Sequence, residues 1–342
     1  MNNISKQTIS DINKLITDKN NIVIIMHYNP DGDALGSALG LYHYLIKKSK
    51  TVTIISPNEY AECYNWMPNS DKIINFSTNK DTASKLISSS ELLFFLDFNN
   101  LSRTENMEKV LSNSSAKKVL IDHHPNPGNI ADIVISDTSV SSTAELIFAV
   151  LENINDNISI DKTIAECIYT GIMTDTGCFN YNSSQPYTFL VVSKLLEKKI
   201  NKDLIYENLY NNFSGSRMQL YGYCLHKKME IIPEYHTAFI SLTKKELQDF
   251  NFKNGDTEGF VNLPLSIKNI KFSAIFIEKD EQIKISFRST GNFPTNIFSS
   301  KNFNGGGHKN ASGGYSKLTL SETINLFKSL LPKYKTELSD EY

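Results

Sequence analysis

Residues 22–37 read IVIIMHYNPDGDALGS, and this stretch decides the fold of the first part of the chain. Its opening run, IVIIM at 22–26, is continuous and rich in β-branched residues, which is typical of a strand buried on both faces of a parallel sheet. After a polar loop, Leu35, Leu39 and Tyr42 recur at helical spacing. The stretch therefore predicts a strand, a loop and a helix, in that order.

The same alternation continues outward from this stretch. Ser142 and Glu145 form a capping-box pattern ahead of an apolar run, and Pro186 is favoured in the first turn of a further helix. The other expected elements are strands at 52–55, 92–96 and 119–121 and helices at 146–151 and 160–174. Strands that alternate with helices predict an α/β fold with a doubly wound, mainly parallel sheet.

The last third of the chain has a different texture. Capping-box patterns predict helix starts at Thr243 and Thr319. Apolar runs at 237–242, 270–277 and 282–287 predict strands. We therefore expect a catalytic domain at 1–185, a helical linker at 186–228 and a smaller mixed α/β domain at 229–342.

The composition is that of a globular protein, with 342 residues and a formal net charge of -2. Proteins that coat long nucleic acid usually carry a basic excess, because phosphate neutralisation dominates that affinity, so we expect no binding to long duplexes. The four cysteines form no CxxC pair, which argues against a zinc ribbon or a disulfide framework and suits a reducing compartment. The N-terminus lacks a signal-peptide layout and no apolar run approaches about 20 residues, so we expect a cytoplasmic protein without a membrane partner.

Ionisable side chains follow the predicted strands at the points where those strands end. In an open parallel sheet, the carboxyl ends of the strands share one edge, where ligands bind. The residues at these ends, with one aspartate at the end of a predicted helix, are His27, Asp31, Asp33, Asp97, Asp122, His123, His124 and Asp175. Carboxylates that converge without partners would repel one another, and divalent cations remove this conflict. The pattern predicts a pair of divalent cations, and ligands without thiolate favour manganese or magnesium.

The spacing indicates how the ligands divide between two cations. His27 and Asp31 are four residues apart across a proline-containing turn, so both can face one ion. Asp33 lies just beyond a glycine and can reach a second ion, and Asp97, alone at its strand end, is the natural bridge. Such a pair of ions, about 3.5–4 Å apart, binds a water molecule and ionises it to the hydroxide that attacks phosphorus.

Four motifs, in order along the chain, resemble those of the DHH phosphoesterase superfamily: HYNPDGDALGS at 27–37, Asp97, DHH at 122–124, and Asp175. The segment NGGGHKNASGG at 304–314 resembles the glycine-rich signature of the DHH-associated C-terminal domain, so the resemblance spans essentially the whole chain. The resemblance implies that one manganese ion is held by His27, Asp31 and Asp97, and the other by Asp33, Asp97, His123 and Asp175. It also implies that Asp122 orients the histidines by hydrogen bonding, and that His124 contacts the phosphate or donates a proton.

A substrate surface is expected around the glycines at 305–307, which let backbone N–H groups approach a ligand without a Cβ in the way. Alone, such a run is more typical of a flexible turn. Arg288 can grip a terminal phosphate with two parallel hydrogen bonds. Arg103 is a second candidate clamp, with a surface salt bridge as the alternative. The expected substrate contacts are Arg103, His124, Ser286, Arg288, Ser289, Gly305, Gly306, Gly307 and His308.

Within the superfamily, the length and the lack of a membrane or sensor segment favour the compact nano-RNase type, whose members degrade oligoribonucleotides of a few residues and dephosphorylate adenosine 3′,5′-bisphosphate (pAp). We expect manganese-dependent hydrolysis of short single-stranded RNA or of pAp, with Mg²⁺ or Co²⁺ as alternative metals. A cyclic or linear dinucleotide phosphodiesterase is the nearest alternative. An inorganic pyrophosphatase or polyphosphatase and a silent nucleotide-binding module follow. The direction of attack, the base preference and the oligomeric state, for which a homodimer is one alternative, stay open.

Overall fold

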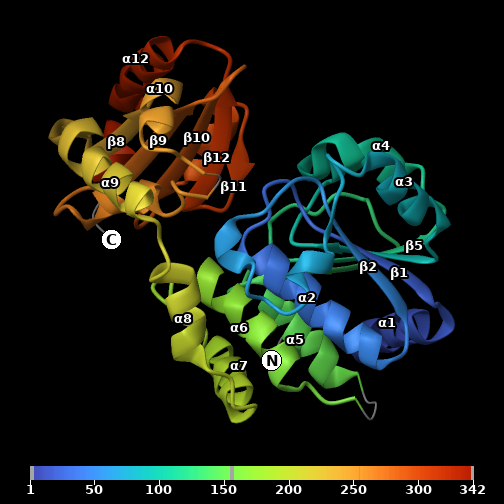
Figure 1. The fold of residues 1–342 in the computed structure, drawn as a ribbon. Helices are drawn as coiled ribbons and strands as arrows, with labels where there is room; N and C mark the ends of the chain where they lie inside the picture. The colour runs from blue at the N-terminus through green and yellow to red at the C-terminus, as the bar shows by residue number, and fades with distance from the viewer. Residues whose placement is uncertain (1–3, 155–157, 254, 340–342) are drawn as a thin grey trace. The chain divides into compact units, whose positions relative to one another are not determined.

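The computed structural model describes residues 4–154, 158–253 and 255–339. The chain divides into two compact units, Met1–Asn212 and Phe213–Tyr342 (Figure 1). The division falls inside the segment expected as a helical linker: α7 (Pro186–Glu197) and α8 (Lys202–Tyr210) belong to the first unit, and α9 (Gly215–Tyr223) belongs to the second. Within the described residues, every helix is too short or too polar to span a membrane.

A six-stranded sheet forms the centre of the first unit, with the strand order β3-β2-β1-β4-β5-β6. The strands are β1 (Asn21–Ile25), β2 (Thr51–Ser56), β3 (Ile74–Asn75), β4 (Leu92–Leu96), β5 (Lys117–Asp122) and β6 (Ile133–Ser136). Every pairing is parallel, which confirms the predicted α/β domain. The strand order reverses between β1 and β4, and ligands of open α/β sheets bind at the carboxyl ends beside such a reversal.

The central strands are apolar throughout because both of their faces are buried. In β1, Ile22 and Ile24 enter the core on one face of the sheet, whereas Val23 and Ile25 enter the core on the other. The first face is covered by α1 (Lys6–Asp18), α2 (Gly32–Lys47), α5 (Thr143–Asn153), α6 (Lys162–Asp175), α7 and α8, and the second by α3 (Lys80–Ser89) and α4 (Glu108–Ser112) (Figure 1).

Three helices of the first face meet closely at one end. A Cβ at Gly32, in the first turn of α2, would lie 2.3 Å from the hydroxyl oxygen of Thr174 near the end of α6. A Cβ at Gly171 of α6 would lie 2.5 Å from the Cβ of Ala144 in the first turn of α5. Because these glycines have no side chain, the start of α2, the start of α5 and the end of α6 come together.

A six-stranded mixed sheet forms the centre of the second unit, with the order β11-β12-β10-β9-β8-β7. The strands are β7 (Met229–Ile232), β8 (Thr237–Leu242), β9 (Phe272–Glu278), β10 (Ile283–Ser289), β11 (Gly306–Gly307) and β12 (Ala311–Ser316). Strands β8 and β9 pair in parallel, and the other four pairings are antiparallel. The predicted mixed α/β domain is confirmed.

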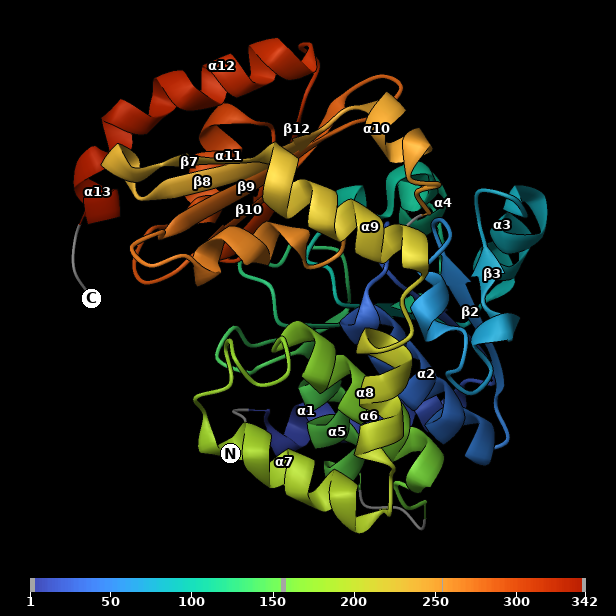
Figure 2. The ribbon, with the colours of Figure 1, turned by 60° about the vertical axis from the view of Figure 1, so that its left-hand side comes forward.

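Helices cover both faces of this second sheet. Phe239 and Phe276 enter an aromatic core on one face, and Ile240 and Ile275 enter a smaller core on the other. The aromatic core lies against α11 (Thr295–Asn302), α12 (Leu320–Leu330) and α13 (Lys335–Ser339), and the smaller core against α9 and α10 (Lys244–Asp249) (Figure 2). The capping boxes predicted at Thr243 and Thr319 are both complete.

Several features differ from the sequence-based expectation, since strands β3, β6, β7, β11 and β12 are not among the predicted strands. Strand β12 is not predicted because Gly313 and Gly314 give it no strand pattern, and its pairing with β10 and β11 supplies the hydrogen bonds instead. The capping box at Ser142 is only half formed. The Ser142 hydroxyl accepts from the backbone N–H of Glu145 (3.1 Å), but the Glu145 carboxylate accepts from the hydroxyls of Ser141 (2.6 Å) and of Thr188 in α7 (2.8 Å).

Short 3₁₀ segments also occur in both units, and a π-helical turn occurs in the second. They are the 3₁₀ segments η1 (Glu62–Tyr64), η2 (Ser70–Lys72), η3 (Leu101–Met107), η5 (Pro233–Tyr235), η6 (Phe260–Ser266) and η7 (Leu331–Tyr334) and the π-helical turn η4 (Cys224–Lys228).

Candidate metal centre

Two clusters of carboxylate and imidazole groups lie where strands β1, β4 and β5 end. The first cluster comprises His27, Asp31 and Asp97, and the second comprises Asp33, His123 and Asp175; in each cluster one ligand atom per residue lies within 4.8 Å of the others. The structure therefore brings together all the residues that the sequence predicts as metal ligands.

The first cluster is built by the loop between β1 and α2 together with the end of β4. His27 is buried, and its Nε2 lies 3.4 Å from Asp97 Oδ2 and 3.9 Å from Asp31 Oδ1. Asp31 is the N-cap of α2, and its Oδ1 accepts hydrogen bonds from the backbone N–H groups of Asp33 (3.0 Å) and Ala34 (3.1 Å). This cap fixes the position of the Asp31 carboxylate beside His27.

The imidazole of His27 is oriented through its other nitrogen. Nδ1 donates to the backbone oxygen of Tyr28 at 2.9 Å. Burial, together with the nearby charge of Arg103, lowers the pKa of His27 despite the opposing charge of Asp31, so the ring is held neutral. Nε2 then carries the lone pair and faces the carboxylates, which is the state that a metal-ligating histidine requires.

The second cluster joins the first turn of α2, the end of β5 and the last residue of α6. His123 Nε2 lies 3.8 Å from Asp33 Oδ2 and 3.5 Å from Asp175 Oδ2. The same nitrogen lies 3.6 Å from Asp97 Oδ1. The two clusters therefore meet at Asp97.

Asp97 adopts a left-handed backbone conformation, with a φ of 66°, directly after β4. Such a conformation costs a residue other than glycine on the order of 1 kcal/mol or more, and it persists where the surrounding structure enforces it. The Asp97 side chain is buried, and its backbone N–H donates to the oxygen of Ile121 in β5 (3.2 Å). The strained position coincides with the point where the two clusters meet.

The N-terminus of α5 holds two of these carboxylates in place. The backbone N–H groups of Thr143 and Ala144 donate to Asp33 Oδ2 and Oδ1 at 2.7 and 2.8 Å. The Thr143 hydroxyl donates to Asp97 Oδ1 at 2.8 Å. Sequence analysis missed these contacts. The capping pattern at Ser142 marks a helix start, however, and the N–H groups there are a natural site for a carboxylate.

The electrostatics of the two clusters fit divalent cations. Burial and the charges of Asp97 and Asp31 raise the pKa of Asp33 well above its ordinary value. Burial and the charges of Asp31, Asp122 and Asp175 do the same for Asp97. Without a counter-charge these carboxyl groups favour the protonated form, and divalent cations would supply that charge. Every donor atom in the clusters is oxygen or nitrogen, which suits Mn²⁺ or Mg²⁺.

Asp122 and His124 form a pair beside the clusters. Asp122, fully buried at the end of β5, accepts a hydrogen bond of 2.7 Å from His124 Nδ1. Burial raises the pKa of Asp122 to about 6. Burial, followed by the charges of Arg103 and His27, lowers the pKa of His124 to about 3. Near neutral pH, His124 is therefore uncharged with its proton on Nδ1, and Nε2 can accept a hydrogen bond.

Arg103 lies at the same edge of the first unit. Its backbone oxygen accepts from the N–H of Tyr28 (2.7 Å), which ties η3 to the loop that carries His27. Burial is the largest effect on the pKa values of His27, His124 and Asp122; the Arg103 charge adds to its lowering effect on the two histidines and opposes its raising effect on Asp122. The side chain is exposed, and across residues 4–154, 158–253 and 255–339 it forms no ion pair, so the surface salt bridge considered for it is not observed.

In the second unit, the expected substrate contacts differ in how far their side chains are exposed to solvent. Ser286 and Arg288 are half-buried and point to the same face of β10, since they are two residues apart on one strand. Ser289 is buried, its hydroxyl donates to the backbone oxygen of Phe293 (2.7 Å) and it accepts from the amide of Asn310 (2.8 Å). The Ser289 hydroxyl thus holds the loop after β10 to the glycine-rich segment.

The glycines at 305–307 have different reasons to lack a side chain. A Cβ at Gly305 would lie 1.9 Å from the backbone oxygen of Gly313, and Gly307 has a φ of 137°. A Cβ at Gly306 would meet nothing within 4 Å, and the residue is exposed. Just beyond, the backbone N–H of His308 donates to the oxygen of Ala311 (2.8 Å). The fold therefore requires glycine at 305 and 307 but not at 306.

The fold and the two clusters are those of a known class of enzyme, the phosphoric ester hydrolases. Residues 21–172 match the model of the DHH family, N-terminal domain, and residues 234–334 match that of the DHHA1 domain. The chain belongs to the DHH family and carries a DHHA1 domain.

Similar proteins cover nearly the whole chain. An exopolyphosphatase-related protein from Bacteroides fragilis is 44% identical, covers 99% of this chain and 100% of its own, and superimposes with a TM-score of 0.94. The probable bifunctional oligoribonuclease and PAP phosphatase NrnA of Streptococcus mutans is 29% identical over 314 residues, which are 90% of this chain and 93% of that protein. The bifunctional oligoribonuclease and PAP phosphatase NrnA of Bacillus subtilis is 27% identical over 85% of this chain and 88% of its own.

A cyclic-di-AMP phosphodiesterase is a more distant relative. GdpP of Bacillus subtilis is 25% identical over 335 residues, which are 94% of this chain but only 49% of that protein.

Proposed function

We propose that this protein is a manganese-dependent phosphoesterase that hydrolyses short single-stranded oligoribonucleotides and pAp. The observation that carries the proposal is the meeting of the two carboxylate and imidazole clusters at Asp97. The substrate class is supported by the two NrnA relatives, which are named as oligoribonucleases and PAP phosphatases and match most of the chain.

In this proposal one cation is held by His27, Asp31 and Asp97, and the other by Asp33, Asp97, His123 and Asp175. When bound, the two cations would ionise a water molecule near neutral pH and neutralise the charge on the phosphoryl oxygens.

The residues of the chain contribute position and polarity. The N–H groups at the start of α5 donate to both oxygens of Asp33 and so favour its ionised form, which opposes the effect of burial and of the neighbouring carboxylates on its pKa. Asp122 holds the proton of His124 on Nδ1, so that Nε2 would accept a hydrogen bond from a hydroxyl group of the substrate or from water. With a pKa of about 3, His124 is hardly protonated near neutral pH. It is therefore a poor proton donor, although the family resemblance implies that role as one alternative.

Substrate phosphates would be bound by arginines from both units. Arg103 is exposed, without an ion pair in the described parts of the chain, and near the clusters, so its guanidinium would bind a phosphate of the substrate. In the second unit we assign Arg288, Ser286, the backbone of Gly306 and His308 to the nucleotide.

A panel of substrates tests the proposal. Purified protein with Mn²⁺ is assayed against pAp, a 5′-labelled RNA dimer and 5-mer, cyclic di-AMP, pyrophosphate and polyphosphate, with Mg²⁺ and Co²⁺ in parallel. We expect turnover of pAp and of both RNAs, with Mn²⁺ the best metal. Turnover of RNA with Mg²⁺ but not Mn²⁺ would overturn the metal assignment.

Two other functions have support that the same panel separates. Polyphosphate hydrolysis is the second candidate because the Bacteroides fragilis relative is named exopolyphosphatase-related. Cyclic di-AMP hydrolysis is the third, through the more distant GdpP. Turnover of polyphosphate alone, or of cyclic di-AMP alone, would replace the proposal, and no turnover at all would favour a silent binding module.

A cytoplasmic location completes the proposal, and a homodimer is one alternative for the oligomeric state. The four free cysteines fit a reducing compartment. Light scattering on the purified protein tests the dimer, and a mass equal to that of one chain would exclude it.

A further inference from the structure

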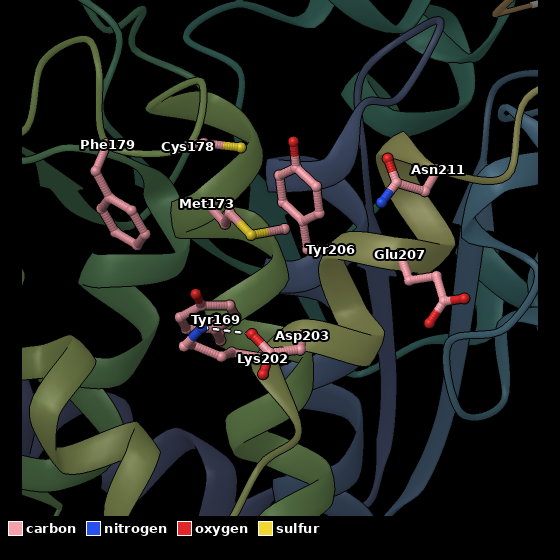
Figure 3. A pocket seen from close by; sticks show the side chains of 9 residues that line it. All are labelled: Tyr169, Met173, Cys178, Phe179, Lys202, Asp203, Tyr206, Glu207 and Asn211. Atoms are coloured by element: carbon pink, nitrogen blue, oxygen red, sulfur yellow. Dashed lines mark hydrogen bonds and ion pairs between the residues drawn. The ribbon is translucent and has the colours of Figure 1, made fainter.

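A pocket of about 530 Å³ lies between α6 and α8 in the first unit (Figure 3). Its floor includes Tyr169 and Met173, which stand one helical turn apart on α6 and are buried. Tyr206 of α8 stands between the α6 side chains and those farther along α8 in Figure 3, and it is 43% exposed. The volume is within the range of about 300–1,000 Å³ that is typical of small-ligand sites. We call this the α6–α8 pocket.

The pocket begins next to the candidate metal centre along the chain. Met173 precedes Asp175 by two residues, and Cys178 follows it by three; both line the pocket. One end of α6 therefore carries a proposed cation ligand and part of the pocket wall.

An unusual turn positions the next part of the wall. Gly177, Cys178 and Phe179 are consecutive residues with left-handed backbone conformations, with φ values of 53°, 56° and 66°. Hydrogen bonds from Cys178 N to Met173 O (2.8 Å) and from Phe179 N to Thr176 Oγ1 (3.0 Å) hold the turn in place. The turn brings the Phe179 ring to 6.2 Å from that of Tyr169. Strain at residues other than glycine is typical of functional segments.

The polar rim of the pocket favours a neutral ring over a phosphate. Asp203 pairs with the ammonium group of Lys202, which leaves that cation neutralised. Glu207 lies one turn farther along α8 and Asn211 is the residue that caps its C-terminus, and in the described residues no hydrogen bond or ion pair engages their side chains. A carboxylate and an amide beside aromatic rings match the donor and acceptor edge of a nucleobase, whereas the net negative charge disfavours phosphate.

We propose that the α6–α8 pocket binds a nucleobase of the oligoribonucleotide substrate. The base stacks on the rings that line the pocket, and its polar edge bonds to Glu207 and Asn211. This inference rests on the proposed function, and it adds a base-binding role for α6 and α8 of the first unit to the role proposed for the glycine-rich segment of the second unit. Stacking on an aromatic side chain tolerates every base, which suits an enzyme that degrades short RNA without strict sequence preference.

The test combines variants of Tyr206 with abasic substrates. Four proteins are compared in Mn²⁺: wild type, Tyr206→Ala, Tyr206→Phe, which keeps the ring, and Leu204→Ala, which changes an exposed residue of α8 outside the pocket. The substrates are a 5′-phosphorylated RNA trimer and three trimers that each lack one base. In wild type, one abasic trimer should show a KM raised by about tenfold, the effect of one stacked base.

The variants should separate by whether they keep the ring. Tyr206→Ala should raise the KM of the intact trimer by about tenfold with little change in kcat, and should abolish the difference between the intact and that abasic trimer. Tyr206→Phe and Leu204→Ala should behave as wild type. The proposal is overturned if Tyr206→Ala matches wild type on the intact trimer, or loses the same factor on intact and abasic trimers.

A binding measurement tests the base site independently of the proposed function. If wild type hydrolyses neither RNA nor pAp, the proposed function fails, and saturation-transfer NMR with adenosine on the metal-free full chain decides the binding question. A signal in wild type and Tyr206→Phe that is lost in Tyr206→Ala supports a base site. Equal signals in all three proteins overturn it.

Discussion

The two carboxylate oxygens of Asp97 face different histidines: Oδ2 lies 3.4 Å from His27 Nε2, and Oδ1 lies 3.6 Å from His123 Nε2. His27 follows β1 and His123 follows β5. Strand β4 lies between these two strands in the parallel sheet, and Asp97 follows β4. A single buried carboxylate can therefore serve two cations at once. The predictions below follow from this arrangement and from the fold that maintains it.

The Thr143 hydroxyl should be needed for full activity although it lies outside both clusters. It donates to Asp97 Oδ1 at 2.8 Å, and groups that orient a metal ligand are typically worth about 10–100-fold in metal affinity or activity. We expect Thr143→Val to lower kcat/KM for pAp in that range at limiting Mn²⁺, and Thr143→Ser, which keeps the hydroxyl, to retain activity. Equal activity of the Val and Ser variants would show that this hydrogen bond is dispensable.

Metal-free protein should be destabilised by Asp97 as the pH rises. Because the pKa of Asp97 is raised in the folded state, its folding free energy is most favourable below the unfolded value near 3.8 and is lost as the pH rises through the folded value. In EDTA, we expect the Tm of Asp97→Asn to exceed that of wild type at about pH 8 by more than at about pH 5.

Divalent cations should reverse this order. Addition of Mn²⁺ at about pH 8 should raise the Tm of wild type more than that of Asp97→Asn, because ligands bound only in the folded state stabilise it. A Tm difference that is independent of pH in EDTA would contradict the raised pKa.

Glycine should be replaceable at 306 without loss of stability but not at 305. A Cβ at Gly305 would lie 1.9 Å from the oxygen of Gly313, so Gly305→Ala should destabilise the protein by about 1–3 kcal/mol. Gly306→Ala meets nothing within 4 Å and should leave the Tm unchanged, while the proposed substrate surface predicts a raised KM for pAp, because the added methyl group would face the nucleotide. Unchanged kinetics of Gly306→Ala would remove this glycine from the substrate surface.

Glu246 should stabilise the second unit in a pH-dependent way. Burial alone would raise its pKa, but the N–H of Thr243, the hydroxyl of Tyr223 and the ammonium of Lys228 outweigh burial and lower the pKa to about 2. The contribution is therefore complete above the ordinary value of 4.5 and is lost as the pH falls toward 2. We expect Glu246→Gln to cost about 2 kcal/mol at neutral pH, measured by urea unfolding.

The other capping box provides a matched control for Glu246. Glu322 accepts the same pair of bonds from Thr319 but is exposed, and within the described residues its carboxylate has no further partner, so Glu322→Gln should have a smaller effect. The difference between Glu246→Gln and wild type should shrink between about pH 5 and pH 3. A difference that stays constant over this range would mean that the carboxylate charge is not what stabilises α10.

Much of the fold and the candidate centre follows from the sequence, for a physical reason. Strands β1 and β4 are continuous apolar runs because both faces of a parallel sheet are buried, and their carboxyl ends share one edge. Residues that follow such strands, such as His27 and Asp97, must therefore lie near one another. Capping boxes at Thr243 and Thr319 are equally local signals, and both are complete in the structure.

Other parts of the centre leave no side-chain signal. The N–H groups of Thr143 and Ala144 that hold Asp33 belong to the backbone, so only the packing of α2 against α5 reveals them. The sequence offers no reason to treat the neighbouring glycines 305 and 306 differently. Their different roles appear only when the path of β12 is known. Glu145 matches a capping box, but its carboxylate accepts instead from the hydroxyls of Ser141, just before the helix, and of Thr188 in α7.

The number of manganese ions in the active protein tests the two-cation centre most directly. Metal-free protein is titrated with Mn²⁺ while bound metal, by elemental analysis, and pAp hydrolysis are followed in wild type, Asp97→Asn and Asp137→Asn, whose carboxylate follows β6 but belongs to neither cluster. The account predicts two ions per chain at full activity for wild type and Asp137→Asn, and weaker binding with activity lowered more than about 100-fold for Asp97→Asn. Full activity without a divalent ion, or an Asp97→Asn variant that binds two ions and stays active, would contradict it.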